Sequence, residues 1–305
     1  MTFVLGHSPL GGSIVFFDQV LNGIQIGLTY VLIAVGYNLI FGVLKIVNLA
    51  YGEVFMVAAY TGLVVSLRVS ANPVVVVLAA LVGATLIGVL IHTIAVLPLG
   101  NVSTLDSPRH LSVIVSTMGI SLVIQNTAVE IFGGYPQRFP RLVPDTRLGF
   151  GNFGVDLSLA FNLLIAGVVI ATFYHVIKHT RLGLRMRALS DNLQLARSMG
   201  VSTTRDQYAA VVISSSLAGL AAIMVSQAIG LVSPFVGAYY GLKGLVAVLV
   251  GGLGRMGGAV VVALLLGLGE AFAASVASNY RDAITFGLMV VFILVRGAAA
   301  SSEAS

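Results

Sequence analysis

The stretch Lys178–Gln207, KHTRLGLRMRALSDNLQLARSMGVSTTRDQ, is the one long charged run in an otherwise apolar chain. It holds six of the sixteen Lys and Arg residues and two acidic residues, Asp191 and Asp206. The flanking runs LLIAGVVIATFYHVI and YAAVVISSSLAGLAAIMV are apolar enough to cross a bilayer, so this stretch is a loop between two spanning helices. Because short loops rich in Lys and Arg stay in the cytoplasm, we expect residues 178–207 on that side.

The inner part of this loop, residues 185–199, has the spacing of an amphipathic helix. Four apolar side chains recur at intervals of three and four: Leu189, Leu193, Ala196 and Met199. Gly200 follows as a stop signal. Because the loop contains nothing else to cover this apolar face, the pattern indicates a docking surface for a partner.

The composition excludes an ordinary soluble domain. Only 9% of the residues are charged, compared with about 25% in soluble domains, and 58% are hydrophobic. There is no cysteine, so no disulfide and no thiolate metal site is expected. The net charge of +5 is concentrated in one loop, so it reflects topology and gives no reason to expect nucleic acid as a partner. The chain is predicted to be an all-α integral membrane protein in contact with lipid.

The apolar runs predict a multi-spanning helical bundle of about eight transmembrane segments, some of them broken or re-entrant. We expect the segments at residues 14–44, 45–67, 74–97, 111–132, 159–177, 208–229, 244–268 and 283–295. The sequence GGLGRMGG at 251–258 interrupts the seventh, which either crosses fully or dips and returns. Residues 230–243 and 269–282 are predicted to be breaks. The topology after residue 230 and the side of the C-terminus stay open.

The loops alternate between the two sides of the membrane. With the basic loop inside, the irregular loop 133–158 is predicted to be periplasmic, the loop 98–110 cytoplasmic, and the turn at Pro73 outside. Residues 1–14 form a polar arm that is also expected outside, and the absence of Lys and Arg before Lys45 agrees with this. The same absence argues against a cleaved signal peptide. All of residues 1–305 are expected to form a single transmembrane domain.

The second apolar segment has an unusually polar start, Asn48–Glu53. A charged residue at the centre of a bilayer helix costs about 2.5–3.5 kcal/mol, so Glu53 should face protein or a water-filled cavity. Two interpretations stay open. Glu53 lines a pathway at a loosened helix start, or it is a buried carboxylate that caps a helix or bonds Tyr51 or Asn48.

The glycine break contains five glycines around Arg255: Gly251, Gly252, Gly254, Gly257 and Gly258. It lacks the Lys-Ser/Thr ending of a nucleotide-binding loop, so we set a phosphate site aside. Broken helices at membrane depth are tolerated beside a cavity or against other protein, so a pathway role and close helix packing both stay open.

Catalytic and metal-binding motifs are missing from the sequence. HExxH, GxSxG and GxxxxGK[ST] do not occur, so we expect no catalytic residue and no cofactor on this chain. His92 and His175 lie in or at the ends of spans without a second ligand at metal spacing, so no metal site is expected.

Three stretches, in this order along the chain, resemble one known family. They are GLTYVLIAVGYNLIFGVLKIVNLAYGEVFMVAAY at 27–60, RLGLRMRALSDNLQLARSMGV at 181–201 and GLKGLVAVLVGGLGRMGGAVVVALLLG at 241–267. Over most of residues 20–296 the chain resembles the shorter permease subunit of branched-chain amino-acid ABC importers. In that family the permease pairs with a second, related permease, two cytoplasmic ATPase subunits that use Mg-ATP, and a periplasmic substrate-binding protein.

The resemblance implies roles for particular residues. Arg187, Ala188, Ala196 and Gly200 match the family's cytoplasmic loop, which docks into the ATPases, and Leu189 and Leu193 complete the expected coupling face. Asn48, Gly52 and Glu53 match family positions in the second segment; with Tyr51, Gly252 and Gly254 they form the expected substrate pathway. The chain departs from the family at Tyr51, where His is common, and at its end, where an Arg-Pro-x-Gly-Leu sequence is usual.

The implied function is import of branched-chain or related amino acids across the bacterial inner membrane, driven by ATP hydrolysis on separate subunits. Relatives with this pattern also serve urea and short amides. The residues alone leave two other classes open, an ion-coupled secondary carrier that uses Glu53 and a membrane scaffold whose basic loop docks a soluble protein. The sequence does not decide the solute, the choice between a homodimer and a heterodimer of permeases, or the role of Glu53.

Overall fold

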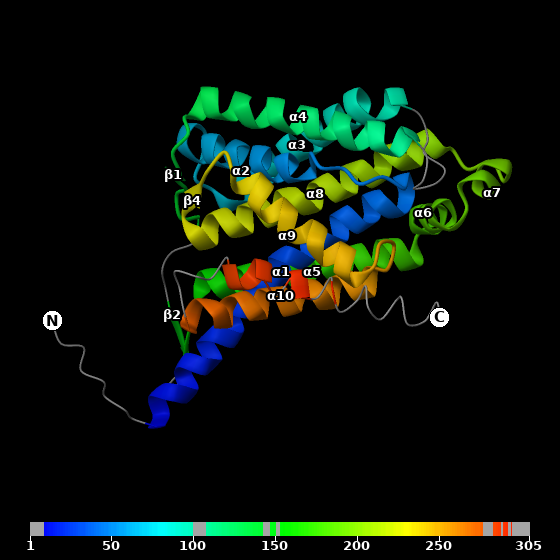
Figure 1. The fold of residues 1–305 in the computed structure, drawn as a ribbon. Coiled ribbons are helices and arrows are strands. Elements are labelled where there is room, and N and C mark those ends of the chain that lie inside the picture. Colours follow the sequence, from blue (N-terminus) through cyan, green and yellow to red (C-terminus); the bar gives the residue numbers. More distant parts are fainter. Residues whose placement is uncertain are drawn as a thin grey trace.

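The computed structural model describes residues 9–99, 108–142, 147–150, 153–276, 283–287, 289–291 and 294. Within these ranges, eight long helices lie side by side and run between the two ends of the molecule (Figure 1). They are α1 (Pro9–Leu44), α2 (Tyr51–Arg68), α3 (Pro73–Ile91), α4 (Pro108–Phe132), α5 (Leu157–His179), α8 (Thr203–Ile229), α9 (Val236–Gly251) and α10 (Met256–Val276). A π turn, His92–Val96, and a 3-10 turn, Leu97–Leu99, extend α3.

Six of these helices are long and apolar enough to cross a membrane, namely α1, α3, α4, α5, α8 and α10. The other two, α2 and α9, have 18 and 16 residues and run alongside them. The predicted multi-spanning helical membrane protein is therefore confirmed. The first helix begins at Pro9, within the predicted polar arm.

The two ends of the bundle differ. Two short helices, α6 (Arg181–Asp191) and α7 (Leu193–Ser198), project from one end, which we call the basic end (Figure 1). The opposite end, which we call the far end, carries two antiparallel two-stranded ladders. One ladder pairs β1 (Gln137–Arg138) with β4 (Leu231–Val232), and the other pairs β2 (Arg147–Phe150) with β3 (Phe153–Asp156).

The chain passes from end to end in the predicted order. The turn before Pro73 and the loop after Phe132 lie at the far end, as does the start of α1 (Figure 1). The end of α3 lies at the basic end, where the ring of His92 meets that of Tyr208 near the start of α8, 4.9 Å between centroids. Residues 100–107 of the predicted 98–110 loop lie outside the described residues. Placing the basic end in the cytoplasm stays a prediction.

Helix α1 is the central element of the core. Every residue from Tyr30 to Leu44 is buried, and α1 packs against α8, α9 and α10. A helix that is apolar on all sides belongs in the interior of a bundle, which explains why this run tolerates so few polar residues. By contrast, α3 and α4 keep many large apolar side chains exposed: Leu78, Val82, Leu86, Val115 and Leu122.

The glycine break reverses the chain, so of the two alternatives predicted for residues 244–268 the return at the break is confirmed and a full crossing as one segment is wrong. Residues 252–255 join α9 to an antiparallel α10, with Gly252 at φ 106° and Gly254 at φ 81°. Only glycine adopts such angles without strain. A Cβ on Gly251 would lie 2.4 Å from the backbone nitrogen of Ala259, so the two helices touch directly beyond the turn.

The breaks predicted on both sides of this segment are also corrected. Helix α9 already begins at Val236, and α10 continues to Val276. Polar residues did not end either helix there, because Lys243 and Glu270 neutralise each other inside the bundle. Residues 283–287 and 289–291 are helical, in line with the predicted last segment, and the remainder of the tail lies outside the described residues.

Candidate functional site

The predicted coupling helix at 185–199 is divided into two helices at Asn192. The backbone of Asn192 is extended (φ −149°, ψ 105°), and its Oδ1 accepts a hydrogen bond of 3.0 Å from the backbone N–H of Leu195. The side chain thus caps α7, as Asn commonly does at a helix start. The prediction of a single helix is therefore wrong, because apolar spacing continues through a residue whose side chain favours a cap.

The predicted stop at Gly200 is confirmed. Gly200 has φ +83°, its N–H donates to the carbonyl of Arg197 (2.9 Å), and the N–H of Val201 donates to the carbonyl of Ala196 (3.1 Å). This pair of bonds is the Schellman arrangement that ends many helices with a left-handed glycine. Gly200 is exposed, at the end of the α6–α7 hairpin.

The predicted apolar face is only partly open to a partner. Leu189 is fully buried and Ala196 is 3% exposed, because α6 folds back against α1, α5 and α8. Leu193 and Ala188 are half-buried, and Arg187 is exposed. Within the hairpin, the large apolar side chains that stay exposed are Leu184, Leu195 and Met199. The buried part of the stripe therefore attaches the hairpin to the bundle, and its tip is the part available for docking.

An ion pair not foreseen from the sequence adds to this attachment. Arg185 Nε lies 3.1 Å from Asp206 Oδ1, which joins α6 to the start of α8. Asp206 is buried, whereas the Arg185 side chain is 40% exposed. Displacement of α6 would therefore act on α8 as well as on α1.

The hairpin and the glycine turn border a common cavity at the basic end, with a volume of about 240 Å³. Met186, Arg187 and Ser190 line it from α6, and Gly254 lines it from the turn. Asn38 of α1 lines it too, and its Oδ1 accepts a hydrogen bond of 2.7 Å from the N–H of Gly254. The turn between α9 and α10 is thus fixed to α1 next to the coupling hairpin.

Glu53 and Gly52 border a second cavity of about 240 Å³, between α2, α4 and α9. Glu53 is 2% exposed, and its Oε1 accepts a hydrogen bond of 3.0 Å from Ser121 Oγ. Its Oε2 has no hydrogen-bond partner among the residues that the structure describes. Where Gly52 and Gly237 line this cavity, the backbones of α2 and α9 are in contact, since a Cβ on Gly52 would lie 2.4 Å from the carbonyl oxygen of Gly237.

The other predicted pathway residues are not gathered at this cavity. Asn48 Oδ1 accepts a local hydrogen bond of 3.0 Å from the N–H of Ala50, and the Tyr51 hydroxyl donates to the carbonyl of Ser214 at 2.6 Å. Among the described residues, the hydrogen bond to Glu53 comes from Ser121 and not from Tyr51 or Asn48. Gly252 and Gly254 belong to the turn at the basic end. The structure therefore unites Gly52 and Glu53 and separates the glycine turn from them.

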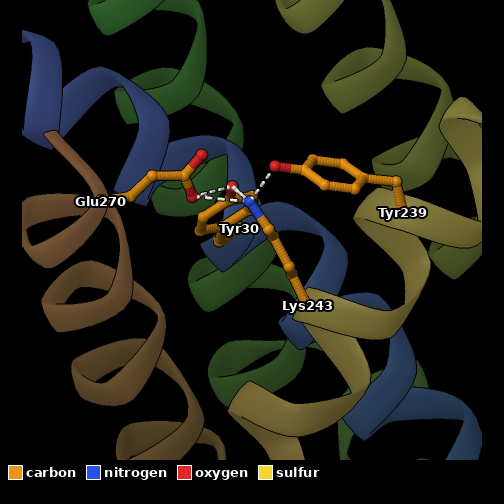
Figure 2. A network of polar contacts seen from close by, with 4 residues as sticks. All are labelled: Tyr30, Tyr239, Lys243 and Glu270. Atoms are coloured by element: carbon orange, nitrogen blue, oxygen red, sulfur yellow. Dashed lines mark hydrogen bonds and ion pairs between the residues drawn. The ribbon is translucent and has the colours of Figure 1, made fainter. Parts of the chain in front are cut away.

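A buried ion pair deeper in the bundle was missed by sequence reasoning (Figure 2). Lys243 Nζ of α9 lies 2.8 Å from Glu270 Oε2 of α10, and the two side chains are 0% and 1% exposed. The hydroxyl of Tyr30 donates to the same oxygen at 2.5 Å, and Lys243 also donates to the hydroxyls of Tyr30 (3.0 Å) and Tyr239 (2.5 Å). The available signal was a pair of opposite charges, one on each side of a glycine break.

The bundle of antiparallel apolar helices defines a multi-pass membrane protein. Residues 19–293 match the family described as branched-chain amino acid transport system / permease component, and the chain belongs to that family.

Named relatives of this chain are transport permeases. It is 28% identical over 295 residues to the high-affinity branched-chain amino acid transport system permease protein LivH of Escherichia coli, with 92% of this chain and 93% of that protein covered. It is 29% identical over 301 residues to BraD, the corresponding protein of Pseudomonas aeruginosa, with 92% and 94% covered. It is also 26% identical over 263 residues to the fructose import permease FruG of Bifidobacterium longum, with 82% and 74% covered. The expected family is confirmed, and the chain is a transport component.

Proposed function

We propose that this chain is a permease subunit of an ABC importer for branched-chain or related amino acids in the bacterial inner membrane, driven by ATP hydrolysis on separate subunits. The observation that carries the proposal is the α6–α7 hairpin, a basic projection with exposed apolar side chains at its tip and buried ones at its base. Family membership supports the permease role. ATP and magnesium belong to the partner subunits in this proposal, and this chain needs no cofactor.

The hairpin has the attachments that a mechanical coupling element requires. A partner that contacts Leu195 and Met199 moves α6, which packs on α1 and is paired with α8 through Arg185. The partner drives transport only if it favours one arrangement of the bundle over the other, because equal binding to both shifts no population. The ATPase must therefore make different contacts with the hairpin before and after ATP hydrolysis.

The proposal includes further partners. A second related permease, identical or different, would cover part of the apolar surface of α3 and α4, and lipid would cover the remainder. A periplasmic binding protein would dock at the far end, beside the β1–β4 ladder. The exposed apolar surface of α3 and α4 is stable only against lipid or another helix.

For the solute path we propose the cavity that Glu53 and Gly52 border. A buried carboxylate oxygen without a partner is costly and is compensated when a ligand group donates to it. The ammonium group of an amino acid is such a donor. The same oxygen also favours the alternative of an ion-coupled carrier. Proteoliposomes distinguish the two, because the subunit proposal expects this chain alone to transport nothing under a proton or sodium gradient.

Charge reversal at the hairpin tests the proposal. We expect Arg187→Glu combined with Met199→Asp to leave insertion unchanged but to abolish retention of an ATPase on purification and ATP-driven uptake. Arg138→Glu at the far end is the matched control, and it should retain the ATPase. Equal retention by both variants would refute the assignment. Gly200→Asp is a poorer test, because φ +83° makes any side chain there a source of backbone strain.

A further inference from the structure

A cavity of about 530 Å³ lies toward the far end of the bundle, among α1, α5, α8, α9 and α10. It reaches the surface, since Asn22, Ile229 and Ser275 in its wall are exposed. Its α1 wall is polar along one helical face, with Gln19, Asn22, Gln25 and Thr29 at intervals of three and four. Most of the polar residues in the first apolar segment, residues 14–44, therefore line this one cavity.

The inner limit of this cavity is aromatic. Tyr240 lines it and stacks on Phe55, with ring centroids 5.3 Å apart and planes inclined by 19°. Tyr30 lies next to Tyr240, at 6.0 Å between centroids, and both Tyr30 and Phe55 are fully buried. The cavity and the Glu53 cavity have no lining residue in common. We call this cavity of about 530 Å³ the recess.

Glu270 is the charged residue in the wall of this recess. Its Oε2 accepts hydrogen bonds from Lys243 Nζ and from the Tyr30 hydroxyl (Figure 2). A buried ion pair is weak support for stability, because apolar residues of similar volume often serve as well or better. Ionisable residues at membrane depth are typical of solute and ion pathways. Stability alone is therefore a poor reason for a Lys–Glu pair at this position.

We propose that this recess binds a zwitterionic solute of amino-acid size, with the ammonium group toward Glu270 and the carboxylate toward the amides of α1. The inference rests on the proposed import function and identifies where the solute enters the chain. Lys243 and Glu270 together carry no net charge. A bound zwitterion therefore adds no unpaired charge to the site, whereas a bound anion or cation adds one. The amides of Asn22 and Gln25 supply N–H donors for a carboxylate. The volume is in the usual range for small-molecule sites.

Thiol labelling tests the site directly, because the chain contains no cysteine. Ser275→Cys in the assembled transporter would be labelled with a charged, membrane-impermeant thiol reagent. We expect saturating L-leucine to slow this labelling severalfold, and 4-methylpentanoate, 3-methylbutylamine and fructose to have little effect. Tyr135→Cys, exposed at the far end outside the recess, is the control and should be labelled equally with and without leucine.

Substitution of the ion pair provides the second arm. Lys243→Met with Glu270→Leu replaces the pair by apolar side chains of similar volume, so we expect normal insertion and normal labelling at Ser275→Cys. Protection by L-leucine should be lost. Unchanged protection in this double variant, or protection of the parent by fructose but by no neutral amino acid, would overturn the proposal. Normal ATP-driven leucine uptake without any protection would refute this site alone, whereas absence of amino-acid uptake would refute the proposed function.

Discussion

The backbone contact between α2 and α9 predicts a large effect from a single methyl group. In Gly52→Ala the new Cβ would lie 2.4 Å from the carbonyl oxygen of Gly237, whereas ordinary contact begins at 3.4 Å. The difference, 3.4 − 2.4, means that the two helices must separate locally by about 1 Å. The obstacle is a backbone atom, so no side-chain rotation relieves it.

The expected magnitude follows from two opposing contributions. Overpacking of a core costs about 1–3 kcal/mol, and a clash with backbone belongs in the upper part of that range. Replacing glycine by alanine in a helix returns about 0.5–1 kcal/mol of backbone entropy. We therefore expect Gly52→Ala to lower the free energy of unfolding by about 1–2 kcal/mol.

The matched control is Gly167→Ala in α5, where no neighbouring atom lies within 4 Å of the new methyl group. Only the entropy contribution applies there, so the control should be neutral or more stable by up to about 1 kcal/mol. Reversible unfolding of both variants in the same detergent measures the difference. Equal stability of Gly52→Ala and Gly167→Ala would show that the backbones of α2 and α9 are not in contact. The arrangement of these two helices beside the Glu53 cavity would then be wrong.

Three further predictions concern single side chains. Asn192→Ala removes the cap of α7 and should cost about 1 kcal/mol locally, seen as faster amide hydrogen exchange in α7 while global unfolding is unchanged. Glu270→Gln leaves Lys243 without its counter-charge and should cost about 3–5 kcal/mol, whereas the apolar double variant of the same pair should recover most of this in the same unfolding measurement. Glu53→Gln keeps an acceptor for the serine hydroxyl, so we expect unchanged stability together with reduced uptake; full uptake would exclude a role for the carboxylate charge.

Much of the fold could be predicted because the bilayer imposes a length on each apolar run. The starts and ends of α3, α4 and α5 follow such runs within a few residues. The alternation of loops between ends followed from one basic loop. Gly200 was also predictable, because a left-handed helix end is a local requirement that glycine satisfies by itself.

The chain reversal at the glycine break was one of two predicted alternatives, and the sequence alone did not decide between them, because a cluster of glycines is compatible with both. Glycines pack helices closely and also turn the chain, and here they do both: Gly252 and Gly254 turn it, while Gly251 and Gly258 bring α9 and α10 together. The partly wrong docking face has a similar cause. The apolar spacing identified residues that have to be buried against something. Only the folded chain shows that Leu189 is buried within this chain and not by a partner.

Glu270 and Glu53 differ in how their charges are satisfied, and this difference decides what each can contribute. Hydropathy scales assign a transfer cost to each residue separately, so Lys243 and Glu270 were both placed in breaks although together they leave only a dipole in the bundle. That pair keeps a fixed, neutral wall at the far recess. Glu53 has Ser121 on one oxygen and, among the residues that the structure describes, no hydrogen-bond partner on the other. The recess therefore offers a solute a wall without net charge, whereas the Glu53 cavity offers a carboxylate oxygen with no described partner.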